Sequence, residues 1–249
     1  MLTANLLVDA ESKLHDMARV QEPIMKSGSQ DSLVLSYLGL RKAVGFIGLG
    51  LPVVLAVGKI LSQGPGLQET ISDYYHTDMR NILVGSLCAI GVFFVSYRGY
   101  DRRDRIAGNL AAGLAIGVAL FPATPFFDPI TWIGVIHVVC SISLFLTLAY
   151  FSFFLFTETD PSKPPTPQKL KRNVVYRASG CVIFACIVLA ALTELPALKP
   201  LAVRFDLRFW LESVIIIAFG VSWLTKGEAI LKDEQDQEDQ ARRAAAGRK

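Results

Sequence analysis

The chain has 249 residues, of which 52% are hydrophobic and 19% are charged, and its mean hydropathy is +0.41. A soluble domain of this length usually carries fewer apolar residues and about a quarter charged ones, so the composition indicates a membrane protein. The net charge of +3 is small, and the basic residues are scattered between apolar blocks. Without a concentrated basic face, a nucleic acid is not an expected partner.

Residues 1–42 form a predicted cytoplasmic segment ahead of the first long apolar stretch. Charged residues interrupt the apolar ones between Met1 and Met25, so no cleavable signal peptide is expected. Leucine, methionine and isoleucine recur there at loosely helical spacing. This pattern fits an amphipathic helix on the membrane surface, and a solvated tail fits equally well.

Six apolar segments approach or exceed the length of a transmembrane helix. A hydrocarbon core of about 30 Å needs roughly 20 residues of α-helix to cross it. The predicted spans are 43–61, 81–97, 106–121, 130–156, 174–195 and 209–225. The predicted fold class is therefore an all-α integral membrane protein, with a six-transmembrane-helix bundle at 43–225. Gly113 and Gly117 form a pair of small residues that would let the third span approach a neighbour closely.

The distribution of lysine and arginine predicts the orientation of these spans. Six spans place both termini on one side, and the cytoplasmic side normally carries the excess of basic residues. With the termini inside, the outer side holds only 5 of the 25 lysines and arginines: Lys59, Arg80, Lys199, Arg204 and Arg208. This uneven split predicts an N-in, C-in topology with a cytoplasmic tail at 226–249. The short loops and the absence of sorting signals favour a bacterial inner membrane.

The predicted cytoplasmic loop at 157–171 is rich in proline in a polar setting. Proline-rich segments are extended and semi-rigid because the ring fixes one backbone angle. We therefore expect a non-helical connector between two halves of three spans each.

The first outer loop gathers ionisable and aromatic residues at the entrance to the second span. Asp73, Tyr74, Tyr75, His76 and Asp78 lie within six positions of one another. Tyrosine is common at membrane boundaries, so a structural interface loop explains the pattern. A ligand-binding or catalytic loop is the alternative.

Further polar residues reach the same outer level. At 1.5 Å per residue, His137 lies roughly 10 Å below the start of the fourth span, and Glu212 lies near the start of the sixth. Ionisable groups at this depth usually face the bundle interior and need partners. With Asp73, His76 and Asp78, they would supply ligands for zinc, or the acid and base of a hydrolase. A satisfied polar network is the simpler explanation, since the chain has no HExxH or HxxxH motif.

A second cluster of candidates, all basic, lies on the predicted cytoplasmic side. Guanidinium groups bind phosphate bidentately, so these residues could hold phospholipid head groups. The candidates are Arg98, Arg102, Arg103, Lys171, Arg172 and Arg177. The alternative is that they only set the topology.

The order of several features resembles that of known six-span membrane proteins. Residues 71–73 read Ile-Ser-Asp in the first outer loop, Tyr97 and Arg98 end the second span, and His137 opens the fourth. These features are similar to those of the damage-regulated autophagy modulators, the Golgi GPI-anchor lipid-remodelling factor and bacterial six-span families of unknown function. The resemblance covers roughly residues 44–225. It implies a six-span membrane bundle and no assigned reaction.

Three functions are hypotheses at this point. The leading one is a multi-pass membrane protein that recognises or organises membrane lipids, its expected partners. The second is a membrane-embedded lipid hydrolase, metal-dependent or acid–base, centred on Asp73, His76 and His137. The third is a small channel or carrier formed by a homo-oligomer. Neither a phosphate-binding GxxxxGK[ST] motif nor a GxSxG motif is present.

Overall fold

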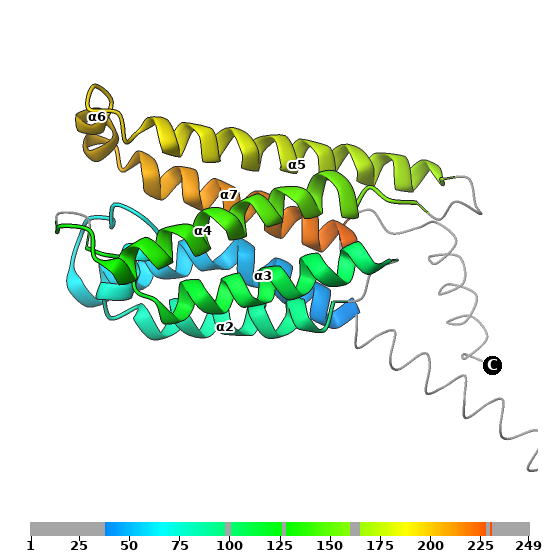
Figure 1. The fold of residues 1–249 in the computed structure, drawn as a ribbon, viewed down its shortest axis with the longest axis horizontal. Coiled ribbons are helices and arrows are strands. Elements are labelled where there is room, and N and C mark those ends of the chain that lie inside the picture. The colour runs from blue at the N-terminus through cyan, green and yellow to red at the C-terminus, as the bar shows by residue number, and fades with distance from the viewer. Residues whose placement is uncertain (1–37, 98–100, 126–127, 160–164, 228–229, 231–249) are drawn as a thin grey trace, which may run out of the picture. The chain divides into compact units, whose positions relative to one another are not determined.

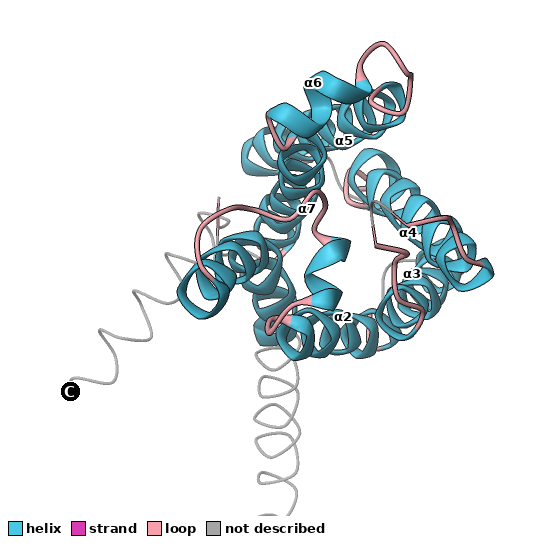
Figure 2. Cartoon of the chain, turned by 90° about the vertical axis from the view of Figure 1, so that its left-hand side faces the viewer, coloured by secondary structure: helices cyan, strands magenta, loops and turns pink. Residues whose placement is uncertain are grey.

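The computed structural model describes residues 38–97, 101–125, 128–159, 165–227 and 230. The chain divides into two compact units, Met1–Leu40 and Arg41–Lys249. All but three of the described residues belong to the second unit, which holds the helical bundle. Every regular element among the described residues is a helix, and none is a strand (Figures 1 and 2).

Six long helices and three short helical segments make up the described chain. In order they are the first helix Leu38–Gln63, the 3₁₀ helix η1 (Ser72–His76), α2 (Arg80–Val95), α3 (Arg102–Leu120), α4 (Trp132–Tyr150), the π-helical turn η2 (Phe151–Leu155), α5 (Pro167–Leu192), α6 (Lys199–Arg204) and α7 (Leu207–Lys226). Each long helix coincides with one of the predicted apolar segments, so the all-α prediction is confirmed for the described part of the chain.

Four helices are long and apolar enough to cross a membrane: Leu38–Gln63, Trp132–Leu155, Pro167–Leu192 and Leu207–Lys226. The other two long helices differ from them in length or charge. Helix α2 is apolar but has only 16 residues, and α3 begins with Arg-Arg-Asp-Arg. The chain therefore has the character of an integral membrane protein, with four helices that meet the length and composition of a span.

The start of α5 differs from the prediction. The helix begins at Pro167, inside the segment at 157–171 that was predicted to be a non-helical connector, so that prediction is wrong from residue 167 onward. The Thr166 side chain caps the helix by accepting the N–H of Lys169 at 3.1 Å. Proline suits the first helical position because its missing N–H would have no partner there.

Glycines allow two pairs of helices to pack closely. A Cβ atom on Gly48 of the first helix would lie 3.2 Å from the Cα of Gly220 on α7, so these backbones are nearly in contact. A Cβ atom on Gly117 of α3 would lie 2.8 Å from Sγ of Cys140 on α4. The predicted second member of that pair, Gly113, has nothing within 4 Å. Close packing of small residues is typical of helices in membranes.

The long helices define two ends of the bundle. We call the end that carries η1, the C-terminus of α3 and the N-termini of α4 and α7 the η1 end, and the opposite one the aromatic end. Figure 1 shows α5 beside α7 and α2 beside α3 between these ends. Six packed rings fill the aromatic end: Phe94, Tyr97, Phe151, Phe156, Phe219 and Trp223.

Two of these rings flank the π-helical turn η2: Phe151 is its first residue, and Phe156 follows its last. The N–H of Phe156 donates to the carbonyl of Phe151 at 2.9 Å, a bond that spans five residues. The wider turn lets Phe151 and Phe156 both reach Trp223, with ring centroids 5.8 and 5.1 Å from it. Aromatic pairs at such distances stabilise a fold beyond their buried area.

Candidate functional site

A cavity of about 70 Å³ lies inside the bundle, between the first helix, η1, α2, α3, α4 and α7. Its lining is mainly apolar, and five residues add polar atoms to it: Ser72, Tyr75, His137, Ser141 and Glu212. An apolar pocket with a few polar groups is the usual form of a small-molecule site.

The short helix η1 lies at its own end of the cavity, where one local pair of hydrogen bonds shapes the turn before it and one bond from α7 holds it. The hydroxyl of Thr70 accepts the N–H of Asp73 and donates to its carboxylate, both at 3.0 Å. The Glu212 carboxylate of α7 accepts the N–H of Ile71 at 2.8 Å. Figure 2 shows this short helix, which leads into α2, inside the ring of longer helices. Glu212 therefore both lines the cavity and anchors the segment at its end.

His137 lies on the second turn of α4 and is only 5% exposed. Its Nδ1 is 2.7 Å from the carbonyl oxygen of Phe121, the residue that ends α3. Because a carbonyl only accepts, Nδ1 carries the proton, and Nε2 of the neutral ring is an acceptor. Nε2 is buried and has no hydrogen-bond partner among the described residues. The end of α3 thus fixes the ring and leaves Nε2 available.

Ser141 follows His137 by one helical turn and also lines the cavity. Residues four apart share one face of a helix, so both side chains belong to the same stripe of α4. The Ser141 hydroxyl is buried and likewise lacks a partner within the described chain. Ser141 is not among the predicted site residues, although its spacing of four positions from His137 is a usable signal.

Asp73 is buried near this site without lining the cavity. Burial raises the pKa of Asp73 above its ordinary value, while the hydrogen bond from Thr70 and the charges of His76 and His137 act in the opposite direction. The Asp73 carboxylate is thus held in place by Thr70 and lies within electrostatic reach of His137.

The remaining candidates of the predicted first outer loop lie on the surface. His76 and Asp78 are exposed, and Nε2 of His76 donates to the carbonyl of Ala123 at 2.8 Å. The structure therefore brings His137 and Glu212 to one cavity and leaves His76 and Asp78 outside it.

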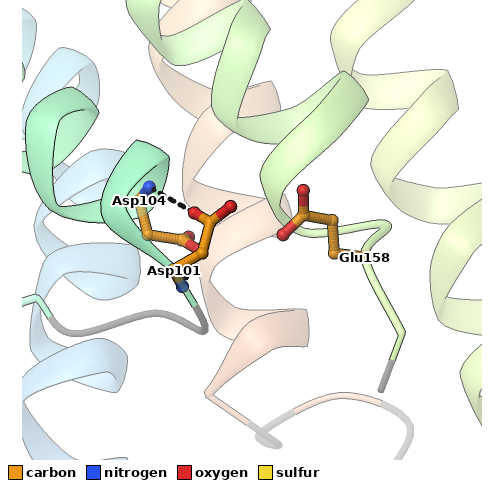
Figure 3. A group of neighbouring side chains, drawn as sticks. All are labelled: Asp101, Asp104 and Glu158. Carbon is orange, nitrogen blue, oxygen red and sulfur yellow. Dashed lines mark hydrogen bonds between the residues drawn. The ribbon is translucent and has the colours of Figure 1, made fainter. Parts of the chain in front are cut away.

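Among the described residues, one group places three possible metal ligands within 4.8 Å of one another: Asp101, Asp104 and Glu158. None of the five residues predicted as zinc ligands belongs to it. Figure 3 shows Asp101 and Asp104 at the start of α3, facing Glu158 beyond the end of α4.

Helix capping and ion pairing account for this acidic group. Asp101 and Asp104 form a capping box, a reciprocal arrangement that stabilises the start of α3. Arg103 bridges the group, with Nε 2.8 Å from Asp101 and a terminal nitrogen 2.9 Å from Glu158. The hydrogen bond from Arg103 lowers the pKa of Asp101 below its ordinary value. The buried Asp104 accepts the hydroxyl of Tyr97 at 3.0 Å.

The predicted head-group ligands have different environments. Arg102, Lys171 and Arg177 are exposed, whereas Arg172 is buried and Arg103 is engaged in the ion pairs described above. Arg98 lies outside the described residues, as do most of the N-terminal segment and the C-terminal tail.

The chain matches no known family model, no curated protein and no solved structure. The resemblance to six-span lipid-remodelling and autophagy-modulating proteins therefore stays a prediction, and the chemistry of the cavity has to carry the functional argument.

Proposed function

We propose that this chain is a six-span, N-in, C-in protein, expected in a bacterial inner membrane, which binds a single aliphatic chain of an amphiphilic lipid in its cavity. Two observations support six crossings. Helix α2 packs along α3, and α3 packs along α4, which itself has the length and composition of a span. Two helices packed alongside a span are expected to lie at the same depth in the membrane.

The observation that carries the proposal is the polarity gradient along the cavity. His137, Ser141 and Glu212 line it toward the η1 end, while Leu148 and Phe219 line it toward the aromatic end. His137 and Leu148 are separated by roughly 16 Å along α4, at 1.5 Å per residue. The lining therefore extends along more than half of α4. This length suits one extended chain, with the polar head near His137 and the methyl end toward the rings.

The unpartnered polar atoms support the same proposal energetically. A buried polar atom without a hydrogen bond costs about 1–3 kcal/mol. Nε2 of His137 and Oγ of Ser141 both carry this cost in the ligand-free structure. A polar head group that bonds to them would recover it, so the free energy of binding would include a specific polar contribution.

Native mass spectrometry of the gently solubilised protein tests the proposal. We expect the wild type to retain a single-chain amphiphile, and Val84→Phe to lose it because Val84 lines the cavity. Val92→Phe is the matched control, since Val92 lies on the same helix with 59% of its surface exposed. Wild-type protein without bound amphiphile, or equal retention in both variants, would contradict the proposal.

An acyl hydrolase acting at the same site is a second candidate. The observation that favours it is the fixed tautomer of His137, whose Nε2 could act as a general base one turn from the Ser141 hydroxyl. No hydrogen bond joins the two side chains in the structure. A fluorophosphonate probe that labels the wild type but not Ser141→Ala would establish this activity, and an unlabelled wild type would exclude Ser141 as its nucleophile.

A further inference from the structure

The polar end of the cavity also restricts the chemistry of the ligand's head group. This inference rests on the proposed function above. We propose that the head group is a hydrogen-bond donor without negative charge, an alcohol or an amine, on an unbranched chain.

The first reason is that His137 offers an acceptor. Its Nδ1–H is committed to the carbonyl of Phe121 at 2.7 Å, so the buried Nε2 of the neutral ring presents a lone pair. A hydroxyl or an ammonium group donates to such a nitrogen. A carboxylate, a phosphate or an ester carbonyl has only acceptor atoms and would leave Nε2 unsatisfied.

The second reason is the charge of the lining. Glu212 is the one carboxylate among the cavity-lining residues, and none of these residues is lysine or arginine. An anionic head group would therefore lie in a medium of low dielectric constant without a cation to pair with. An ammonium group could instead pair with the carboxyl group of Glu212. A hydroxyl is compatible with Glu212 and can also accept the hydrogen of Ser141.

Four probes with ten carbons each separate these chemistries: decan-1-ol, decylamine, decanoic acid and decane. Their occupancy is measured by native mass spectrometry at equal concentration in the same detergent, with Val84→Phe as the background for non-specific uptake. We expect the alcohol and the amine to show at least tenfold higher occupancy than the acid and the alkane. Equal occupancy by the acid or the alkane would overturn the head-group inference and leave chain binding in place. No probe above background would overturn the proposed function itself.

Two variants test which side chain contacts the head group of each probe. His137→Phe keeps an aromatic ring but removes the acceptor, and we expect the preference for decanol over decane to fall about tenfold. Glu212→Gln keeps an oxygen for the N–H of Ile71, so the segment at the end of the cavity stays anchored. We expect this variant to weaken decylamine binding more than decanol binding. An unchanged preference in His137→Phe, or an equal effect on both probes in Glu212→Gln, would contradict the assignment.

Discussion

The two ends of the bundle differ in the buried polar groups that line the cavity. At the aromatic end, Asp104 accepts the hydroxyl of Tyr97, and Ser152 donates to Ser222 at 3.1 Å. At the η1 end, Tyr74, His137 and Ser141 each have a buried polar atom without a partner among the described residues. The indole nitrogen of Trp223 and the side-chain carbonyl oxygen of Asn173 also lack a partner among the described residues, at the aromatic end, but neither residue lines the cavity.

This difference separates a region that stabilises the fold from one that can bind. Packed rings and paired polar groups at the aromatic end leave little space for a bound molecule. The η1 end combines a cavity with unsatisfied atoms, an arrangement that lowers stability and is typical of functional sites. Four sets of variants test this contrast, from the largest expected effect to the smallest.

Removal of the central ring of the aromatic end should have the largest effect. Trp223 is 1% exposed and contacts five other rings, so Trp223→Ala should lower the free energy of unfolding by about 3 kcal/mol, the lower end of the range for buried aromatic residues. The value is low because lipid also solvates apolar groups. Trp210→Ala, at a 54% exposed site on the same helix, should change stability little. Denaturant titration in detergent measures the free energy of unfolding of both variants. Equal losses of stability in the two would contradict the placement of Trp223 in the core.

Loss of the anchor of η1 should have the next largest effect. Glu212→Ala leaves the buried N–H of Ile71 without its acceptor, at an expected cost of about 2 kcal/mol. Hydrogen exchange should accelerate at the backbone amides of η1, Ser72–His76. Glu212→Gln retains an acceptor oxygen and should exchange at nearly the wild-type rate. Unchanged exchange in Glu212→Ala would mean that η1 is held by other contacts.

Two serines on one continuous helical segment provide a direct comparison of the ends. Ser152→Ala removes the partner of the buried Ser222 hydroxyl and should cost about 1 kcal/mol. Ser141→Ala removes a hydroxyl that has no partner, so ligand-free stability should stay the same or rise. Thermal unfolding of both variants under identical conditions measures the difference. A greater loss in Ser141→Ala would reverse the contrast between the ends.

The smallest effect concerns pH. Burial raises the pKa of Asp73, so the native state keeps a proton that the unfolded chain has already released. Between the ordinary aspartate pKa and the raised one, stability should therefore fall as pH rises. Asp73→Asn should abolish this pH dependence, which melting temperatures measured across a series of pH values would show. A wild-type stability that rises with pH relative to Asp73→Asn would contradict the predicted direction.

The sequence was sufficient to predict the long helices. Spacing and hydropathy located all six apolar segments because each long helix presents a continuous apolar run. Helices η1 and α6 were missed, since five and six residues are too few to show a period. The helical start at Pro167 was also missed because proline content was given more weight than the Thr166 cap.

The candidate site was predictable only in part. His137 and Glu212 were identified because ionisable residues are rare at that depth and need partners. Their meeting at one cavity depends on how α4 and α7 pack, which no local pattern determines. Ser141 was overlooked because serine is unremarkable in an apolar helix. Its importance comes from facing the same cavity as His137.

A density map of the protein purified with its native lipids tests the central claim most directly. We predict elongated density in the cavity, with one end within hydrogen-bond distance of Nε2 of His137 and the other end beside Phe94 and Phe219, which line the cavity. A cavity that holds only water, or one closed by its own side chains, would contradict the claim that this bundle binds an amphiphile.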